Sequence, residues 1–399
     1  MTAERETGSR QMHLIQMLFH MPTSHTIGAW REPADEQLEG LGSIAYWQKI
    51  ARLAEKGRLD GIFFADTPAP HDRYRDGPLS SIEYGAHWPT HDPLAACAVM
   101  AAATERLGFG TTMSITGTPP YLAVRRISTL DCMSGGRFGW NIVTGHVRGE
   151  HLAAGIDQMP HDERYDYADE YMEICYRLWD SAPADAIVAD RETGIFVDMS
   201  RVRMVDFQGR YLRCKAIGPT MPSKQGRPVL IQAGSSGRGM QFAVTHAELV
   251  FAIQPDLKRM LNFMERIRGA AQEAGKAPPP VIFGIQPVLG GTEEEANRRL
   301  RALQDRASIE GALSRMSGTL GIDFSTFELD KPISEMETDA SQGMMAAIAG
   351  GNPHLTLREI ARKVGVTGGI PQFVGTPEQC AIHMEALWRE TGCHGFNIS

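Results

Sequence analysis

Short apolar runs alternate with amphipathic helical patterns along most of the chain. In the segment 162–179, for example, apolar residues recur at intervals of three and four, the pattern of a helix with one buried face. Runs that predict buried strands lie at residues 13–20, 61–66, 108–114, 137–144, 228–234, 249–254, 281–289 and 395–398. Strands that alternate with helices form a parallel sheet, so the pattern predicts an α/β fold, and eight such strands predict a (β/α)8 TIM barrel. A doubly wound open sheet is the alternative, but its usual G-x-G-x-x-G turn does not follow the first run.

Two long segments interrupt this alternation. We expect one domain over residues 11–399, preceded by a polar tail at residues 1–10. Residues 181–226 predict a surface excursion that contains a hairpin turning at Gln208 and Gly209. The alternation is lost again at about 307–370, where Gly, Ser and Met are frequent. We interpret that segment as an irregular, lid-like insertion before the last helix.

Composition and charge exclude several classes of protein. A formal net charge of −8 gives no electrostatic reason to expect binding to nucleic acid or to an anionic membrane. Six cysteines are widely spaced and form no C-x-x-C pair, which argues against structural zinc or a disulfide scaffold and favours a reducing cytoplasm. No apolar stretch reaches the length of a membrane-spanning helix. We therefore expect a cytoplasmic protein whose ligands are small molecules.

Polar residues stand at or near the carboxyl ends of three predicted strands. They are Asp66, Thr112, Asn141 and Thr144. Ligands of TIM barrels bind at that end of the strands, so these side chains are candidates for a binding site. Each one taken alone also fits a plain hydrogen bond to a loop.

Two predicted helix starts carry groups suited to an anion. Gly234, Ser235 and Ser236 follow the fifth predicted strand, where backbone N–H groups and hydroxyls can converge on a phosphate; an ordinary turn is the alternative. His161 and Tyr165 flank a predicted N-cap at Asp162 and are four residues apart, so both can face one ligand. An ordinary cap with a packed tyrosine explains that pair equally well.

Histidines are frequent in the loops after the first, second and fourth predicted strands, and include His25 and His146. No H-x-H or H-E-x-x-H spacing occurs, so acid–base roles are favoured over a metal site, and no metal is expected. Met17, Phe19, Trp88 and Met113 are candidates for an apolar wall beside a ligand, with core packing as the alternative for each.

Several motifs together resemble one enzyme family. They are Thr129-Leu130-Asp131, Ser134-Gly135-Gly136-Arg137, Trp140-Asn141-Ile142-Val143-Thr144 and His161-Asp162-Glu163-Arg164-Tyr165, with further likeness at residues 63–66, 228–234 and 395–397. The chain resembles the bacterial-luciferase-like flavin monooxygenases, in the branch of nitrilotriacetate monooxygenase component A. That branch includes enzymes acting on EDTA, dibenzothiophene sulfone and long-chain alkanes.

The resemblance implies a TIM barrel that binds reduced FMN (FMNH2), uses O2 as co-substrate and oxygenates a small organic molecule. A separate NAD(P)H:flavin reductase would supply the reduced flavin, and a homo-oligomer (dimer or tetramer) is expected. The family's FMN positions match Asp66, Thr112, His161, Tyr165, Ser235 and Ser236, with Asn141, Thr144 and Gly234 beside them. The histidines near the flavin ring match His25 and His146, the candidates for proton transfer.

The chain departs from the family pattern in three places. Relatives carry Gly-His-His where this chain has Ser24-His25-Thr26, and Thr-Ser where it has Thr144-Gly145-His146. The chain also stops at Ser399, before the closing helix of relatives, which predicts either a truncated sequence or a barrel incomplete at its seam. Two other functions stay open: a deazaflavin (F420)-dependent oxidoreductase of the same superfamily, and a non-catalytic flavin-binding protein.

Overall fold

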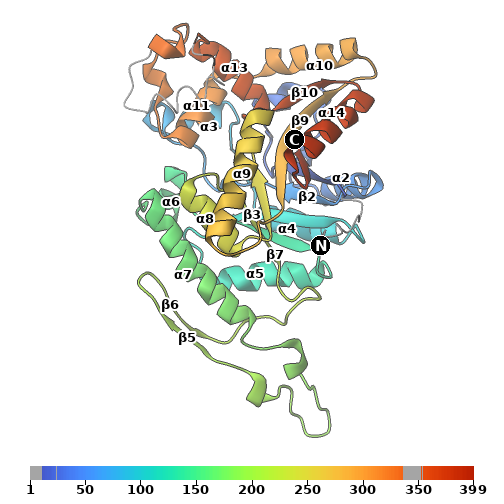
Figure 1. Cartoon of the computed structure of the whole chain (residues 1–399), viewed down its shortest axis with the longest axis vertical. Coiled ribbons are helices and arrows are strands. Elements are labelled where there is room, and N and C mark those ends of the chain that lie inside the picture. Colours follow the sequence, from blue (N-terminus) through green and yellow to red (C-terminus); the bar gives the residue numbers. More distant parts are fainter. Residues whose placement is uncertain (1–10, 24, 336–351, 353) are drawn as a thin grey trace, which may run out of the picture.

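Eight parallel strands form a closed ring at the centre of the molecule (Figure 1). The computed structural model describes residues 11–23, 25–335, 352 and 354–399. The ring strands are β1 (His13–Leu18), β2 (Gly61–Phe64), β3 (Gly108–Ser114), β4 (Phe138–Val143), β7 (Val229–Gln232), β8 (Leu249–Ala252), β9 (Val281–Leu289) and β11 (Gly395–Ile398). They pair in that order, and β11 then pairs with β1. The predicted (β/α)8 barrel is confirmed, and the open-sheet alternative is excluded.

The seam of the barrel is complete, so the prediction of an incomplete one was wrong. Strand β11 pairs in parallel register with β9 on one side and with β1 on the other, where Gly395 lies opposite His13. The two strands approach closely there, because a Cβ placed on Gly395 would overlap the backbone oxygen of His13. Four residues of β11 are enough to close the ring.

Apolar side chains fill the inside of the barrel. Ile231 of β7 lies against Gly110 of β3 and Gly139 of β4, and a Cβ on either glycine would come within 3.0 or 3.1 Å of its Cδ1 atom. The glycines therefore make room for one large side chain, as expected where residues of a small barrel interdigitate. The same interior cluster contains Met17, Phe19, Phe63, Phe251 and Ile282.

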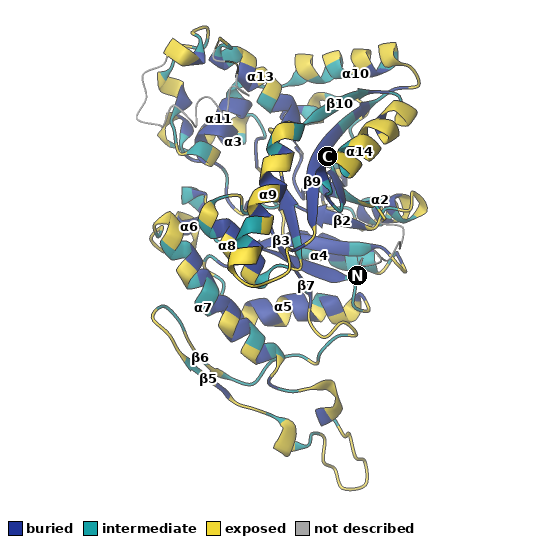
Figure 2. Ribbon diagram, in the orientation of Figure 1, coloured by how far each residue is buried: buried dark blue, intermediate teal, exposed yellow. Residues whose placement is uncertain are grey.

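An outer layer of amphipathic helices covers the ring. The main helices are α2 (Ile44–Lys56), α4 (Pro93–Ala101), α5 (Pro120–Met133), α7 (His161–Trp179), α8 (Gly237–His246), α9 (Leu257–Glu273), α10 (Glu293–Arg306) and α14 (Pro377–Thr391). Figure 2 shows buried strands at the centre and helices with exposed outer faces. Shorter helices are α1 (Gln37–Gly40), α3 (Leu79–Glu83) and α6 (Arg148–Ala154). No helix in the described part of the chain is long and apolar enough to cross a membrane.

The two interrupting segments differ in how well the sequence predicted them. In the first, β5 (Val205–Gln208) and β6 (Arg213–Ala216) form the expected antiparallel hairpin, in an arm that extends away from the barrel (Figure 1). In the second, the expectation of irregular structure was wrong for the described residues. Helices α11 (Ile309–Leu320) and α13 (Leu357–Thr367) pack on each other around a buried apolar cluster, and β10 (Gln372–Gly375) extends the pairing of β9. The predicted tail and residues 336–351 of the insertion lie outside the described residues.

Candidate active site

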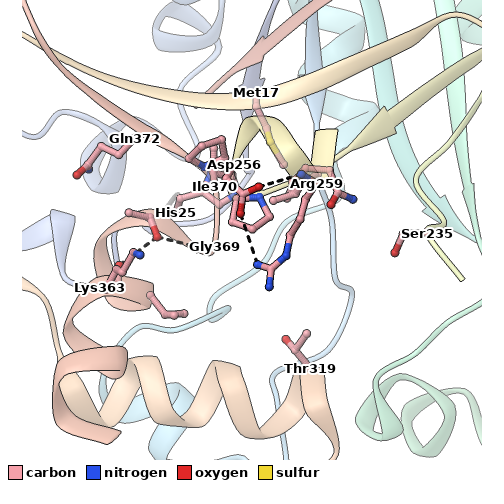
Figure 3. Close-up of a pocket in the computed structure, with 18 of the residues that line it drawn as sticks. Met17, His25, Ser235, Asp256, Arg259, Thr319, Lys363, Gly369, Ile370 and Gln372 are labelled. Atoms are coloured by element: carbon pink, nitrogen blue, oxygen red, sulfur yellow. Dashed lines mark hydrogen bonds and ion pairs between the residues drawn. The ribbon is translucent and has the colours of Figure 1, made fainter. Parts of the chain in front are cut away.

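A cavity of about 1240 Å³ opens at the carboxyl ends of the barrel strands. Its wall comes from the ends of β1 and β2, the loops after them, helices α9, α11 and α14, and the turn after α13. Four of the predicted site residues line it: His25, Asp66, His146 and Ser235. Figure 3 shows Gln372 and Lys363 on one side of this space, Ser235 on the other, and Arg259 between them. The cavity therefore lies where ligands of TIM barrels bind.

Histidines from separate loops gather in the wall of the cavity. His25, His71 and His87 are buried. Burial is the main cause that lowers the pKa of His25 and of His71 to about 3; the charge of Arg315 contributes to both values, and His146 contributes to that of His71. The rings of His71 and His87 lie 4.5 Å apart. Both ring nitrogens of His71 and the Nδ1 atom of His87 have no hydrogen-bond partner among the described residues. The cluster is thus neutral at physiological pH, with free ring nitrogens.

The two predicted catalytic histidines have different surroundings. His25 packs edge-on against Phe19 with ring centroids 5.0 Å apart, and its Nδ1 atom forms a hydrogen bond with the hydroxyl of Ser399. His146 is solvent-accessible through the open cavity, yet its depth in the protein lowers its pKa, and Arg164 adds to this effect. Both line the same cavity. Both imidazoles are therefore neutral at pH 7, and the same effects that lower their pKa oppose their protonation.

Asp66 brings a carboxyl group into the cavity wall after β2. Burial raises its pKa to about 7, and the charges of Asp92 and Glu150 add to this, while a hydrogen bond from Thr90 at 3.4 Å opposes it. Asp66 therefore exchanges its proton near neutral pH. The sequence placed Asp66 at a strand end but gave no sign of the two neighbouring carboxylates.

Thr112 and Asn141, on neighbouring strands β3 and β4, form one pair. The amide nitrogen of Asn141 donates to the Thr112 hydroxyl at 2.9 Å, and both residues are buried. The other amide atom of Asn141, Oδ1, has no partner among the described residues. Thr144, one residue beyond β4, accepts a hydrogen bond at its carbonyl from Thr116 at 3.5 Å. None of these three residues is in the lining of the cavity.

The starts of α7 and α8, each predicted from the sequence to carry groups suited to an anion, lie side by side in the structure. Burial raises the pKa of the Tyr165 hydroxyl, and the nearby side chains of Ser236 and Gln232 oppose this effect. A Cβ on Gly239 would lie 2.8 Å from the Tyr165 hydroxyl oxygen and 2.9 Å from that of Ser236, so a glycine is needed for these two hydroxyls to lie this close to the start of α8. Gly234 lies in the same turn, where its backbone N–H donates to the Gln232 side chain. The arrangement is a cradle of hydroxyls and backbone N–H groups beside Ser235.

One expectation about these helix starts was wrong. Helix α7 begins at His161 after Pro160, with no side-chain cap, so Asp162 is not its N-cap. Instead the Asp162 carboxylate pairs with the exposed His161 ring at 2.6 Å, and that ring lies 5.4 Å from the Tyr165 ring. The Arg238 guanidinium binds Asp166 at 3.0 Å and Asp169 at 2.5 Å, and lies over the Tyr165 ring, 5.6 Å from its centroid. It braces α8 against α7.

The apolar wall was predicted only in part. Met17 and Phe19 line the cavity, whereas Met113 packs in the core between the barrel and its helices and Trp88 is half exposed. The sequence also missed Arg315, which comes from the insertion, and Glu150, which lies buried on α6. Neither stands at a strand end, so strand-end reasoning gave no signal for them.

Similarity to known proteins covers nearly the whole chain. The family described as luciferase-like monooxygenase matches residues 17–395. The chain is 35% identical over 378 residues to dimethyl-sulfide monooxygenase of Hyphomicrobium sulfonivorans, covering 93% of this chain and 78% of that protein. It is 37% identical over 406 residues to dibenzothiophene-sulfone monooxygenase of Rhodococcus erythropolis (strain XP), covering 98% and 89%. A solved structure of riboflavin lyase with modified FMN and riboflavin superposes with a TM-score of 0.87 at 32% identity, covering 98% of this chain and 87% of that one.

Proposed function

The chain belongs to the luciferase-like monooxygenase family, and from this premise we propose that it is the FMNH2-dependent oxygenase of a two-component system. The branch expected from the sequence motifs is confirmed, because dibenzothiophene-sulfone monooxygenase was among its predicted members. The single observation that best supports the cofactor is the cradle at Tyr165, Ser236 and Gly239, which opens beside the cavity. The riboflavin lyase structure, which contains modified FMN, adds support from a relative.

The residues present fit the phosphate end of FMN. Hydroxyls of Tyr165 and Ser236 and the first N–H groups of α8 can donate to a phosphate, and the positive end of the helix dipole favours an anion there. Glycine at position 239 lets both hydroxyls lie against the start of α8, since a Cβ there would crowd them. His161, Gly234 and Ser235 complete this end of the proposed site.

The residues of the cavity fit the ring end. Of the strand-end residues, Asp66 lines the cavity, whereas Thr112, Asn141 and Thr144 lie near the carboxyl ends of β3 and β4, outside its lining. The Oδ1 atom of Asn141 is a hydrogen-bond acceptor without a partner among the described residues. Bound reduced FMN would supply two electrons, so that O2 and substrate give oxygenated substrate, water and oxidised FMN. Met17 and Phe19 would keep water from the reacting atoms.

Proton transfer falls to groups already in the cavity wall. We propose His25 or His146 as the acceptor, because each imidazole is neutral at pH 7. Asp66, with its pKa raised to about 7, is a second group able to exchange a proton in this range. Helices α11 and α13 form one side of the cavity, which supports a covering role for the insertion.

Further parts of the proposal concern partners and location. A separate NAD(P)H:flavin reductase would provide the reduced FMN, and the enzyme is proposed to form a dimer or tetramer. The six cysteines all lie in the described part of the chain and no two of them form a disulfide, which fits the proposed reducing cytoplasm.

Oxygen incorporation tests the proposed reaction. The chain, a flavin reductase, NADH and FMN would be incubated under ¹⁸O2 with dimethyl sulfide, dibenzothiophene sulfone, a long-chain alkane or nitrilotriacetate, and products analysed by mass spectrometry. We expect one ¹⁸O atom in the product of at least one substrate. Formation of hydrogen peroxide alone with every substrate would favour the non-catalytic flavin-binding alternative. Hydride transfer with F420, with no ¹⁸O incorporated, would favour the F420-dependent one.

A further inference from the structure

Arg315 is a buried cation in the wall of the cavity. It belongs to α11, and 8% of its surface is exposed. Its guanidinium donates hydrogen bonds to the backbone oxygens of His25 at 3.0 Å and Val364 at 2.7 Å. No Asp or Glu among the described residues lies within ion-pair distance of it. Burial lowers its pKa to about 10, and no carboxylate in the described part of the chain offsets that effect. The carbonyls that hold the cation in place are neutral.

The groups around Arg315 do not balance its charge. Its field adds to burial in lowering the pKa of His25, His71 and His87, so these rings are neutral neighbours. His71 is 1% exposed and lines the cavity, and neither of its ring nitrogens has a partner among the described residues. A neutral imidazole offers one N–H donor, so His71 adds an unused donor to the unpaired cation.

The other cations of the cavity are placed differently. Arg259 of α9 has its own carboxylate, Asp256, at 3.8 Å, and is less buried than Arg315. Figure 3 shows the Arg259 side chain pointing into the space between Lys363 and Ser235. Arg315 is thus a buried cation that has no counter-ion among the described residues.

We infer that Arg315, with His71 beside it, binds an anionic group of the substrate, a carboxylate or sulfonate. An isolated buried charge is costly unless it is paired, and a planar guanidinium matches the two oxygens of such a group. Met17, Phe19 and Met316 supply apolar surface in the same cavity, which suits an organic anion with an apolar body. The inference rests on the proposed function, because it assumes that a substrate shares the cavity with the flavin.

Two probes of equal length isolate the charge. Isothermal titration calorimetry on the purified full chain would compare hexanoate with hexanamide. We expect hexanoate to bind at least about tenfold tighter, as charge-assisted hydrogen bonds are stronger than neutral ones. Arg315→Gln should weaken hexanoate binding by about tenfold or more and change hexanamide binding by less than about threefold. Arg259→Gln, the control at a cation that already has a partner, should change both by less than about threefold.

Several results would overturn the inference. Equal binding of the two probes by the unmodified chain would do so, as would a parallel loss of both in Arg315→Gln. If Arg315→Gln does not fold, Arg315→Lys takes its place. The lysine keeps the charge but lacks the planar fork, so hexanoate should still bind tighter than hexanamide, but by a smaller factor than in the unmodified chain. A factor equal to that of the unmodified chain would contradict the inference.

Reduced FMN is the other anion that Arg315 could hold, and a second titration separates the two. Under anaerobic conditions, Arg315→Gln should bind reduced FMN within about threefold of the unmodified chain. Loss of reduced-FMN binding with hexanoate binding preserved would assign Arg315 to the flavin and refute the substrate role. If the unmodified chain binds no reduced FMN but still prefers hexanoate, the proposed function fails while the anion site stands.

Discussion

Replacement of Asp66 by asparagine tests the electrostatics of the cavity through protein stability. The folded protein raises the pKa of this carboxyl from 3.8 to about 7, so folding favours its protonated form. Between those two values the native state holds more protons than the unfolded state, and the free energy of unfolding therefore falls as pH rises. A difference of about 3 pKa units corresponds to at most about 4 kcal/mol, at about 1.4 kcal/mol per unit. The loss of unfolding free energy caused by ionisation of Asp66 is therefore complete above pH 7 and absent below about pH 4.

The Asp66→Asn side chain carries no charge and keeps an oxygen that can accept the hydrogen bond from Thr90. We expect this variant to match the unmodified protein in stability at pH 4 and to exceed it at pH 8, by up to about 4 kcal/mol. Urea denaturation at pH 4, 6 and 8, without flavin, measures the difference. Asp157→Asn, at an exposed carboxylate, is the control and should change stability by less than about 0.5 kcal/mol at each pH. An Asp66→Asn effect that is independent of pH would refute the reasoning.

Two further predictions concern strand β11, which closes the barrel, and helix α14, which precedes it in the chain. Phe396→Ala on β11 removes a fully buried ring and should lower the free energy of unfolding by about 3–5 kcal/mol in urea denaturation, whereas Phe196→Ala, at a 64% exposed position on the arm, should cost less than about 0.5 kcal/mol. Similar losses of unfolding free energy in the two variants would contradict a stabilising role of the buried Phe396 side chain of β11. Thr376→Ala removes one half of the capping box at the start of α14 and should cost about 1 kcal/mol by the same measurement; an unchanged midpoint would count against the cap.

The strands and the main helices could be predicted because their signals are local. Most barrel strands are short runs rich in apolar residues. Asp92 and Pro93 open α4 with a side-chain cap and a first-turn proline, which are both local signals of a helix start. The insertion was misjudged for the opposite reason. Leu313, Phe324 and Leu357 form its core across long gaps in the sequence, so no short window shows the pattern. Its buried helix α11 also contains glycines and serines, which look like loop residues when their packing partners are unknown.

The site could be predicted only where function follows from a strand end or a helix start. Tyr165 and Ser236 were paired on that basis, and the structure brings them into contact. Asp131 and Arg137, within the motifs that revealed the family, have structural surroundings instead: Asp131 accepts a hydrogen bond from the Phe138 N–H at 3.3 Å, and Arg137 donates to the Leu107 carbonyl at 2.6 Å. Arg315 was missed because its importance depends on its burial and on the lack of a counter-ion among the described residues. Neither property is visible in the sequence.

The central claim is that the cavity and its cradle hold reduced FMN by its phosphate. Anaerobic titration of the chain with reduced FMN and reduced riboflavin, which differ by that phosphate, tests it most directly. The unmodified chain should bind reduced FMN at least about tenfold tighter than reduced riboflavin, and Tyr165→Phe with Ser236→Ala should remove most of that preference. Equal affinity for the two flavins, or tight binding of F420 with no binding of reduced FMN, would contradict the account.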